Sequence, residues 1–142
     1  MANSSKYVFI AIAGLAIWGG IIAATSSKPT AKKPQSQWTT QQKATLCKQY
    51  ISGLMGRPTS IMSHYQTDDS GQVYIKYTRT DDGTQWRYVC AVDNTRIVWA
   101  SYLNDTGEWG RWRNEDAAKL QIDSDKKIVT LQANTFTKTM NL

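Results

Sequence analysis

The sequence predicts an α+β protein with one N-terminal transmembrane helix, followed by a small domain in which one helix packs on a five- or six-stranded antiparallel sheet. Three observations predict this class. An uncharged apolar run is long enough to span a bilayer, one later segment repeats apolar residues at helical spacing, and the rest alternates apolar and polar residues between turn signals. The predicted parts are a transmembrane anchor over 1–24, a flexible tether over 25–37 and a soluble domain over 38–142.

The chain has 142 residues, of which 41% are hydrophobic, and it contains nine Gly, three Pro and two Cys. The roughly 100 residues that follow the anchor and tether suffice for one small core, so a two-domain enzyme is excluded. The modest Gly and Pro content excludes a collagen-like or proline-rich chain, and two cysteines are too few for a disulfide-dense miniprotein. The composition therefore indicates a small globular module on an apolar anchor.

The apolar run extends from Tyr7 to Ala24 and reads YVFIAIAGLAIWGGIIAA. At 1.5 Å per residue it forms roughly 27 Å of helix, close to the thickness of the bilayer hydrocarbon core. A cleaved signal peptide is the alternative, because Lys6 supplies a basic start and small residues end the run. A retained span is favoured, since signal peptides usually have only about 7–15 apolar residues. Small residues at Ala16, Gly20 and Ala24 would permit self-association of the span.

Most of the positive charge lies outside the folded domain. The chain carries a net charge of +6, but four of its 17 basic residues and none of its 11 acidic residues precede position 43, so residues 43–142 carry only +2. A nucleic-acid-binding domain concentrates basic residues on its folded surface. Here Lys28, Lys32 and Lys33 follow the span, where anionic headgroups would attract them. Membrane lipid is therefore a predicted partner and nucleic acid is not.

The orientation of the span rests on opposing observations. Lysines are more numerous after the span than before it, which favours a cytoplasmic domain. The very short N-terminal tail and the pair of cysteines described below favour the opposite orientation. We predict a single-pass protein of the inner membrane whose C-terminal domain is periplasmic.

A tether and one helix follow the span. Residues 25–37, TSSKPTAKKPQSQ, contain no large apolar residue and hold two of the three prolines, which predicts an extended tether. Directly afterwards, Thr39 and Gln42 match a capping box. Apolar residues then recur at i, i+3, i+4 spacing until Gly56, which suits the left-handed cap that ends a helix. A helix is predicted over 40–55.

Beyond residue 64 the apolar period changes from 3.6 to 2, and turn signals rich in Asp, Asn and Gly follow at regular intervals. One face of each strand should therefore be buried, and the sheet is expected to curl toward a partial barrel. Strands are predicted around residues 73–78 and 86–92, and at 61–66, 96–102, 119–123 and 127–133. The predicted core positions in them include Val73, Ile75, Tyr77, Trp86, Tyr88, Cys90, Val92, Ile97, Trp99, Leu120, Ile122, Ile128 and Leu131.

The cysteines carry the most informative chemical signal. Cys47 lies on the apolar stripe of the predicted helix, and Cys90 lies on the apolar face of a predicted strand. Packing the helix on the sheet would bring them together, so a disulfide and an oxidising compartment are predicted. Two unpaired core cysteines in a reduced protein are the alternative. The spacing excludes a CxxC metal site, and no cofactor is predicted.

No recognisable catalytic signature is found in the sequence. His64 is the only histidine, and the chain has no GxSxG, HExxH or phosphate-binding glycine loop. The paired acids at 68–69 and 81–82 precede glycines, so turn formation explains them. The acids at 123 and 125 lack the glycine and the distal glutamate of a calcium loop. We therefore predict neither enzymatic activity nor a metal site.

One segment resembles a protein-contact surface, because Trp109, Arg111, Trp112 and Arg113 interleave two indoles with two guanidinium groups. Trp and Arg are the residue types most enriched at binding hot spots. Single-stranded nucleic acid is a formal alternative, since these side chains also stack on bases. In a structural alternative the indoles close one end of the core and the arginines pair with neighbouring acids, namely Glu108, Glu115 and Asp116.

Three segments of the domain resemble a group of small prophage-encoded membrane proteins. These segments are LCKQYISGLMGR at 46–57, YIKYTRTDDGTQWRYVCAV at 74–92 and RIVWAS at 96–101. Some members of that group are superinfection-exclusion proteins, in which a single N-terminal span holds a small domain on the periplasmic side of the inner membrane. The quoted segments are structural in character, so the resemblance bears on fold and placement more than on contact residues.

The resemblance implies a membrane-anchored prophage superinfection-exclusion protein. Such a protein blocks DNA injection by related phages at the inner membrane through non-catalytic protein contact. The implied partners are a phage tail or injection protein, a host inner-membrane protein, or both. An accessory membrane subunit of a conjugation or secretion apparatus is the main alternative, and a periplasmic enzyme or cell-wall modifier is a third.

Overall fold

The computed structural model describes residues 37–142. The predicted span Tyr7–Ala24, its small-residue stripe and the tether up to residue 36 lie outside the described residues. Within the described part, no helix is long and apolar enough to cross a membrane. This part contains one α-helix, α2 (Thr40–Met55), and two 3-10 turns, η2 (Thr59–Ile61) and η3 (Asn114–Asp116).

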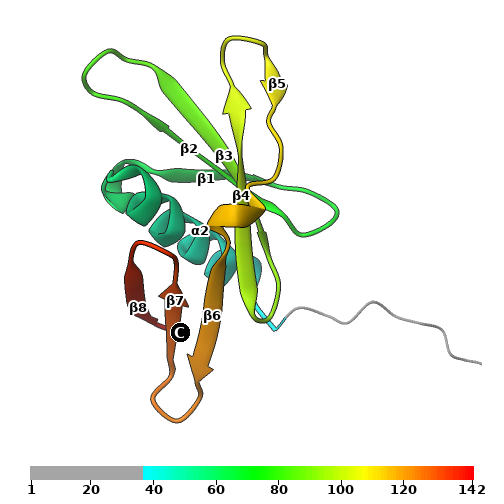
Figure 1. Cartoon of the computed structure of the whole chain (residues 1–142), viewed down its shortest axis with the longest axis vertical. Helices are drawn as coiled ribbons and strands as arrows, with labels where there is room; N and C mark the ends of the chain where they lie inside the picture. The colour runs from blue at the N-terminus through cyan, green and yellow to red at the C-terminus, as the bar shows by residue number, and fades with distance from the viewer. Residues whose placement is uncertain (1–36) are drawn as a thin grey trace, which may run out of the picture. The chain divides into compact units, whose positions relative to one another are not determined.

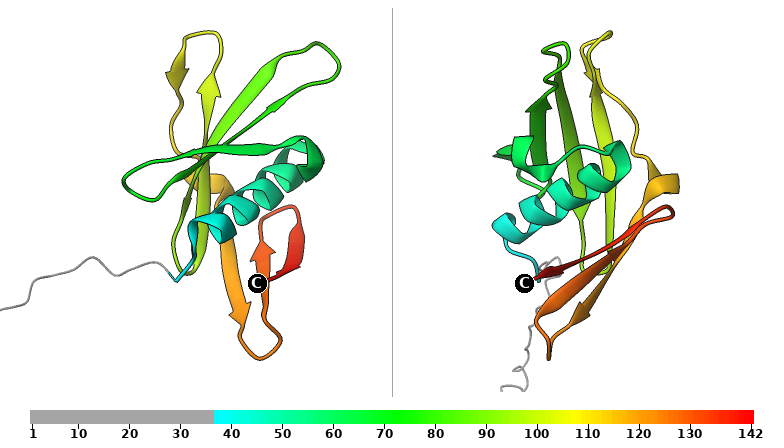
Figure 2. Two further views of the ribbon diagram at one scale, coloured as in Figure 1. Left: turned by 180° about the vertical axis from the view of Figure 1, so that it is seen from behind. Right: turned by 90° about the vertical axis from the view of Figure 1, so that its left-hand side faces the viewer.

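Seven strands form one antiparallel sheet in the order β1-β2-β3-β4-β6-β7-β8. The short β5 pairs with residues 102–103 of β4, whereas β6 pairs with residues 96–97 of β4. Helix α2 lies across one face of this curled sheet, with β6, β7 and β8 turned away from β2 and β3 (Figures 1 and 2). The predicted α+β class is confirmed. The strands are β1 (Ser63–Thr67), β2 (Val73–Thr78), β3 (Gln85–Val92), β4 (Arg96–Leu103), β5 (Glu108–Trp109), β6 (Ala118–Asp123), β7 (Ile128–Gln132) and β8 (Thr137–Asn141).

The predicted strand number of five or six is too low. The six predicted strands exist with end shifts of one or two residues, but β5 and β8 were not expected. Strand β8 has the sequence TKTMN and no buried residue, so it lacks the apolar alternation that marks a strand. It forms because every one of its residues pairs with β7. Strand β5 has only two residues and depends on its pairing with β4.

Helix α2 matches the predicted range because both of its ends are determined locally. The Thr39 hydroxyl accepts from the Gln42 amide at 3.1 Å, and the Gln42 side chain accepts from the Thr39 amide at 3.0 Å. These bonds complete the predicted capping box. At the other end Gly56 has φ 67°, and its N–H donates to the Ser52 carbonyl at 2.9 Å. A glycine adopts this left-handed conformation without strain.

The core lies between α2 and the sheet face that carries alternate residues of the central strands. No charged or polar residue of the described part is buried. Burying apolar side chains contributes about 25 cal/mol per Å², so this face dominates the stability of the domain. Ile122, Ile128 and Trp86, predicted for the core, are only partly buried. The core residues include Leu46, Cys47, Tyr50, Ile51, Val73, Ile75, Tyr77, Tyr88, Cys90, Ile97, Trp99, Leu120, Val129 and Leu131.

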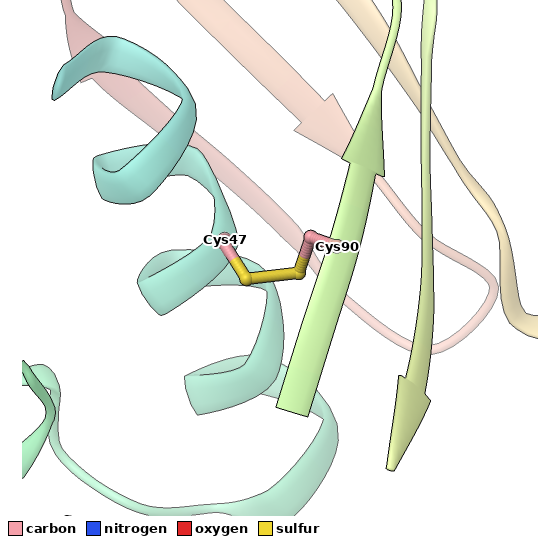
Figure 3. Close-up of a disulfide and its surroundings, with 2 residues drawn as sticks. All are labelled: Cys47 and Cys90. Carbon is pink, nitrogen blue, oxygen red and sulfur yellow. A yellow bond between two sulfur atoms is a disulfide. The ribbon is translucent and has the colours of Figure 1, made fainter. Parts of the chain in front are cut away.

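Cys47 and Cys90 form the predicted disulfide, which joins α2 to β3 (Figure 3). Their Cα atoms lie 5.8 Å apart, within the normal range for a disulfide. Both side chains are fully buried at 0% exposure. The bond therefore crosslinks helix and sheet inside the core, and the alternative of two unpaired cysteines does not hold.

The end of the sheet reaches the helix through two contacts. The Phe136 ring, just before β8, lies against Gly53 so closely that a Cβ at position 53 would overlap it. One residue into β8, the Lys138 ammonium donates to the Gln49 side chain and to the Ser52 hydroxyl, both at 3.2 Å. Gly53 is therefore needed in the helix for packing, although glycine is a poor helix former.

Loss of the disulfide should destabilise the domain substantially. The bond closes a loop with a sequence separation of 43 residues. On the chain-entropy relation, this loop closure contributes about 4 kcal/mol. We expect Cys47→Ala with Cys90→Ala to lower the free energy of unfolding by about this amount, measured by urea denaturation. Free thiols in the denatured, unreduced wild-type protein would contradict the crosslink.

Gly53→Ala should destabilise the protein although alanine favours helices. Overpacking destabilises by about 1–3 kcal/mol, whereas the higher helix propensity of alanine stabilises by about 1 kcal/mol. We therefore expect the free energy of unfolding to fall by about 1 kcal/mol. In a Phe136→Leu background the same substitution should be neutral or stabilising, because the ring is gone. A double-mutant cycle by denaturation measures this coupling. Equal effects in both backgrounds would show that the ring does not constrain position 53.

Candidate functional site

The structure separates the residues of the predicted contact segment. Trp109 lies in β5, pairs with Tyr102 of β4 and is 40% exposed. The Arg111 guanidinium instead makes a two-pronged hydrogen bond to the Glu115 carboxylate at 3.0 and 2.8 Å. Trp112, the residue that follows Arg111, is half-buried. Trp109 and Arg111 therefore have different partners within the domain, and their contact role stays a prediction.

The arginines hold the segment against the edge of β4. Arg113 donates to Glu115 at 3.0 Å, and its guanidinium lies 5.4 Å from the centre of the Trp99 ring. The backbone amides of Gly110 and Arg113 donate to β4 carbonyls, both at 2.8 Å. Pairing of the arginines with neighbouring acids is the structural alternative raised from the sequence. Both arginines are thus bound within the domain.

Hydrogen bonds from Arg111 and Arg113 help to lower the pKa of the Glu115 carboxyl to about 2. The bond from Arg111 has the largest effect. The carboxylate is exposed, so salt screens this interaction and it adds little to global stability. Its effect is local, because it fixes how residues 110–116 run between β5 and β6.

A different set of aromatic side chains forms a continuous surface. Tyr65, Tyr74, Trp109 and Tyr102, here called the outer platform, succeed one another with ring centroids 6.1, 5.4 and 5.3 Å apart. Tyr74 belongs to the residues of β2 that alternate with the buried ones, so it faces away from α2. The outer platform therefore lies on the sheet face opposite the helix.

Small buried residues lie under these rings. Tyr74 pairs with Val89, which in turn pairs with Ala100 of β4. Val89 is 4% exposed and Ala100 is 2% exposed, although both face away from the helix. Because the aromatic rings are the large side chains of this face, we infer that they cover the small ones. The rings of the outer platform thus pack on buried side chains of the sheet and do not project freely into solvent.

Two basic residues flank the outer platform. The Lys76 ammonium lies 5.2 Å from the centre of the Tyr65 ring, and the Arg87 guanidinium lies 3.9 Å from that of Tyr102. Cation–π contacts of this kind stabilise by about 0.5–1 kcal/mol at exposed sites. Neither cation has a carboxylate partner within residues 37–142. The surface therefore combines exposed aromatic area with positive charge that no carboxylate neutralises.

Two tyrosines of the outer platform, Tyr65 and Tyr74, have a raised pKa. Burial raises the pKa of Tyr65, and burial together with a hydrogen bond to Asp68 raises that of Tyr74. The Asp68 carboxylate also accepts from the amides of Ser70 and Gln72, at 3.0 and 2.9 Å. The Tyr74 hydroxyl donates to the same carboxylate at 2.9 Å. Asp68 therefore both stabilises the turn and orients the Tyr74 hydroxyl.

The outer platform lies far from the point where the tether joins the domain. The Gln37 amide donates to the Asn94 side chain at 3.0 Å, and the Trp38 indole donates to the Asp93 carbonyl at 2.8 Å. The chain therefore joins the domain at the β3–β4 turn, before β4 begins. Trp109 pairs near the other end of β4, about 20 Å along the strand at 3.3 Å per residue (Figure 1).

Sequence reasoning missed most of the outer platform. Tyr74, Lys76 and Arg87 occupy the outward half of the predicted alternation, and their aromatic and basic character was a usable signal. Tyr102 becomes part of the site only through its pairing with β5. Tyr65 sits at an irregularity of the β1–β2 register, which periodicity does not reveal.

The other chemistry-bearing residues have local roles. The His64 ring bonds the Thr67 hydroxyl at 2.8 Å within β1. Asp82 accepts from the Thr84 amide at 3.0 Å, which is the predicted turn geometry. Within residues 37–142, no three His, Cys, Asp or Glu side chains are grouped so as to hold a metal ion.

Comparisons with protein-family models, with curated proteins and with solved structures found no match for this chain.

The pKa of Glu115 should depend on Arg111. It lies below its ordinary value, so the contribution of this carboxylate to folding is complete above about pH 4.5 and is lost as the pH falls toward about 2. Arg111→Gln removes the main hydrogen-bond donor, and we expect the pKa to rise toward its ordinary value in a carboxyl NMR titration. Arg57→Gln, which removes a partner of Asp81, is the matched control. An unchanged Glu115 pKa in R111Q would refute this account.

Proposed function

We propose that this protein is a membrane-tethered binding module whose outer platform contacts another protein. The observation that carries the proposal is the outer platform itself: four linked aromatic rings on a braced sheet, with Trp109 40% exposed. Aromatic residues and arginine dominate binding hot spots because they bury large areas with little loss of conformational freedom. A rigid sheet holds these side chains ready for contact, which lowers the entropic cost of binding.

The resemblance to prophage-encoded membrane proteins makes superinfection exclusion the biological role that we propose. In this role the domain blocks injection of DNA by related phages at the inner membrane, through contact with a phage tail or injection protein or a host membrane protein. The mechanism requires no chemical step. Occupation of a site that the incoming apparatus needs is sufficient.

The periplasmic placement is part of the same proposal, and the disulfide supports it. A buried disulfide between Cys47 and Cys90 is typical of proteins that fold in an oxidising compartment. For a protein of the inner membrane, that compartment is the periplasm. The domain would then meet injected phage components on the side from which they arrive.

Tethering would supply the concentration that such a blocker needs. A flexible tether of about 13 residues has a root-mean-square span of roughly 20 Å, which confines the domain close to the membrane. Such confinement raises the effective concentration of the domain toward millimolar, so modest affinity suffices. Because the tether joins at the β3–β4 turn, the outer platform at the other end of β4 remains free to make contact.

The proposal predicts that protection from phage depends on both the span and Trp109. In cells that express the full chain, Trp109→Ala should weaken protection in plaque assays with a panel of related phages, because truncating a hot-spot residue costs about 2 kcal/mol or more of binding. Leu103→Ala is the matched control, since Leu103 is similarly exposed at 39% on the same hairpin. Protein levels should be normal for both variants.

Replacing residues 1–24 by a cleavable signal peptide should also abolish most protection, because the exported domain loses its local concentration. Phage adsorption should be normal in every strain and DNA injection should fail only where protection holds. Reduced adsorption with normal injection, or full protection by the W109A variant, would contradict the proposed mechanism. A rise in transfer or secretion activity on expression would instead support the alternative of an accessory apparatus subunit.

A further inference from the structure

Lys76 and Arg87 are directly opposite each other in the β2–β3 ladder. Like charges at such a position repel, which destabilises an antiparallel pair. Each cation is held over a tyrosine ring, on Tyr65 and Tyr102 respectively, rather than by a carboxylate. Two adjacent cations are therefore left on one surface of the sheet without a counter-charge from residues 37–142.

The terminal N–H groups of Arg87 are the donors left for an outside partner. Its Nε atom has no hydrogen-bond partner in the described part of the chain, but it is buried and an outside group cannot reach it. A guanidinium carries five N–H donors in a planar fork that matches a carboxylate or a phosphate. The geometry of this cation pair thus fits an anionic group delivered from outside the domain.

A second like-charge pair in the same sheet provides a contrast. Arg96 of β4 lies opposite Lys119 of β6, but both residues are exposed to solvent. Arg96 also donates to the Asn114 side chain at 2.9 Å. Water screens the repulsion at that site, and no aromatic ring of residues 37–142 makes a cation–π contact with either cation. Lys76 and Arg87 are instead half-buried among the rings of the outer platform.

The ring geometry favours a polypeptide over a nucleic acid. Bases bind by stacking on open ring faces. Here the Tyr102 face is covered by the Arg87 guanidinium, and Trp109 meets its two tyrosine neighbours at interplanar angles of 72° and 78°. Two cations also fall short of the basic groove that a nucleic-acid strand requires. A polypeptide segment with carboxylates and a neighbouring apolar side chain matches the cation pair and the exposed Trp109 ring.

We propose that Lys76, Arg87 and Trp109 bind an acidic segment of a protein partner. One or two carboxylates of the segment contact the cation pair, and a neighbouring apolar side chain packs on Trp109. This inference rests on the proposed function, because it names the chemistry of the partner that the outer platform contacts. The like-charge pair is a cost to the free domain that binding removes.

Lys76→Glu separates this role from a structural one. The substitution puts a carboxylate opposite Arg87, so it should raise the thermal midpoint of unfolding while it weakens binding. Lys119→Glu is the matched control, because it makes the same charge change opposite Arg96. Lys119→Glu should leave binding unchanged. A purely structural Lys76 would lose stability on substitution.

The test uses the full-length protein in a non-ionic detergent and fluorescence anisotropy. The probe is a fluorescein-labelled peptide of alternating Glu and Ser with one central Leu. The same peptide with Gln in place of Glu, and labelled oligo(dT), serve as comparisons. We expect saturable binding of the Glu peptide only, weakened about tenfold or more by Lys76→Glu and unaffected by Lys119→Glu.

Tighter binding of oligo(dT) than of the Glu peptide would overturn the proposal in favour of a nucleic-acid surface. Equal losses in K76E and K119E would overturn it by showing that only net charge matters. Absence of saturable binding below about 1 mM would also overturn it. The proposed function fails separately, since it depends on phage protection and on W109A. Protection lost in W109A without Glu-peptide binding would leave the function standing and the acidic partner rejected.

Discussion

The disulfide between Cys47 and Cys90 is the constraint on which both faces of the sheet depend. It fixes α2 to the centre of β3, where Cys90 pairs with Val73 on one side and Trp99 on the other. The preceding residue of β3, Val89, faces the opposite way and pairs with Tyr74. A crosslink on the inner face therefore holds the backbone directly beneath the outer platform. Because this backbone is fixed, the aromatic rings above it can keep one arrangement.

Side chains alternate between the two faces of the sheet along each strand, and this alternation gives the abundant aromatic residues of the domain two roles. On the inner face Tyr77, Tyr88 and Trp99 form a row with ring centroids 6.0 and 5.7 Å apart, and all three are buried. Burial raises the pKa of Tyr88, and the hydrogen bond between its hydroxyl and that of Tyr77 raises it further. The outer platform uses the other half of the strand positions. Aromatic content alone predicts neither role, because only the strand period assigns each ring to a face.

Sequence reasoning succeeded wherever structure is encoded locally. The capping box at Thr39 and the left-handed Gly56 determine α2 within its own residues, and apolar alternation marks β2 and β3. The disulfide could be predicted because the apolar stripe of α2, which carries Cys47, and the apolar face of the sheet, which carries Cys90, must pack together in a single core. Strand β8 was missed because its polar sequence pairs only through tertiary context. The site was harder to predict, since the opposition of Lys76 and Arg87 depends on register and not on spacing along the chain.

The two cations beside the outer platform differ from several others of the described surface in having no acid partner. Elsewhere an acid accompanies each of several cations, as Asp82 accompanies Arg79 and Glu115 accompanies Arg111. A sequence selected for stability alone would place a carboxylate opposite Arg87 as well. The repulsion there acts between one pair of side chains, whereas the disulfide contributes about 4 kcal/mol. The fold therefore tolerates the conflict easily, and local conflicts of this kind are typical of functional sites. In this domain, stability built on the inner face permits the unpaired cations of the outer one, where we propose that a partner binds.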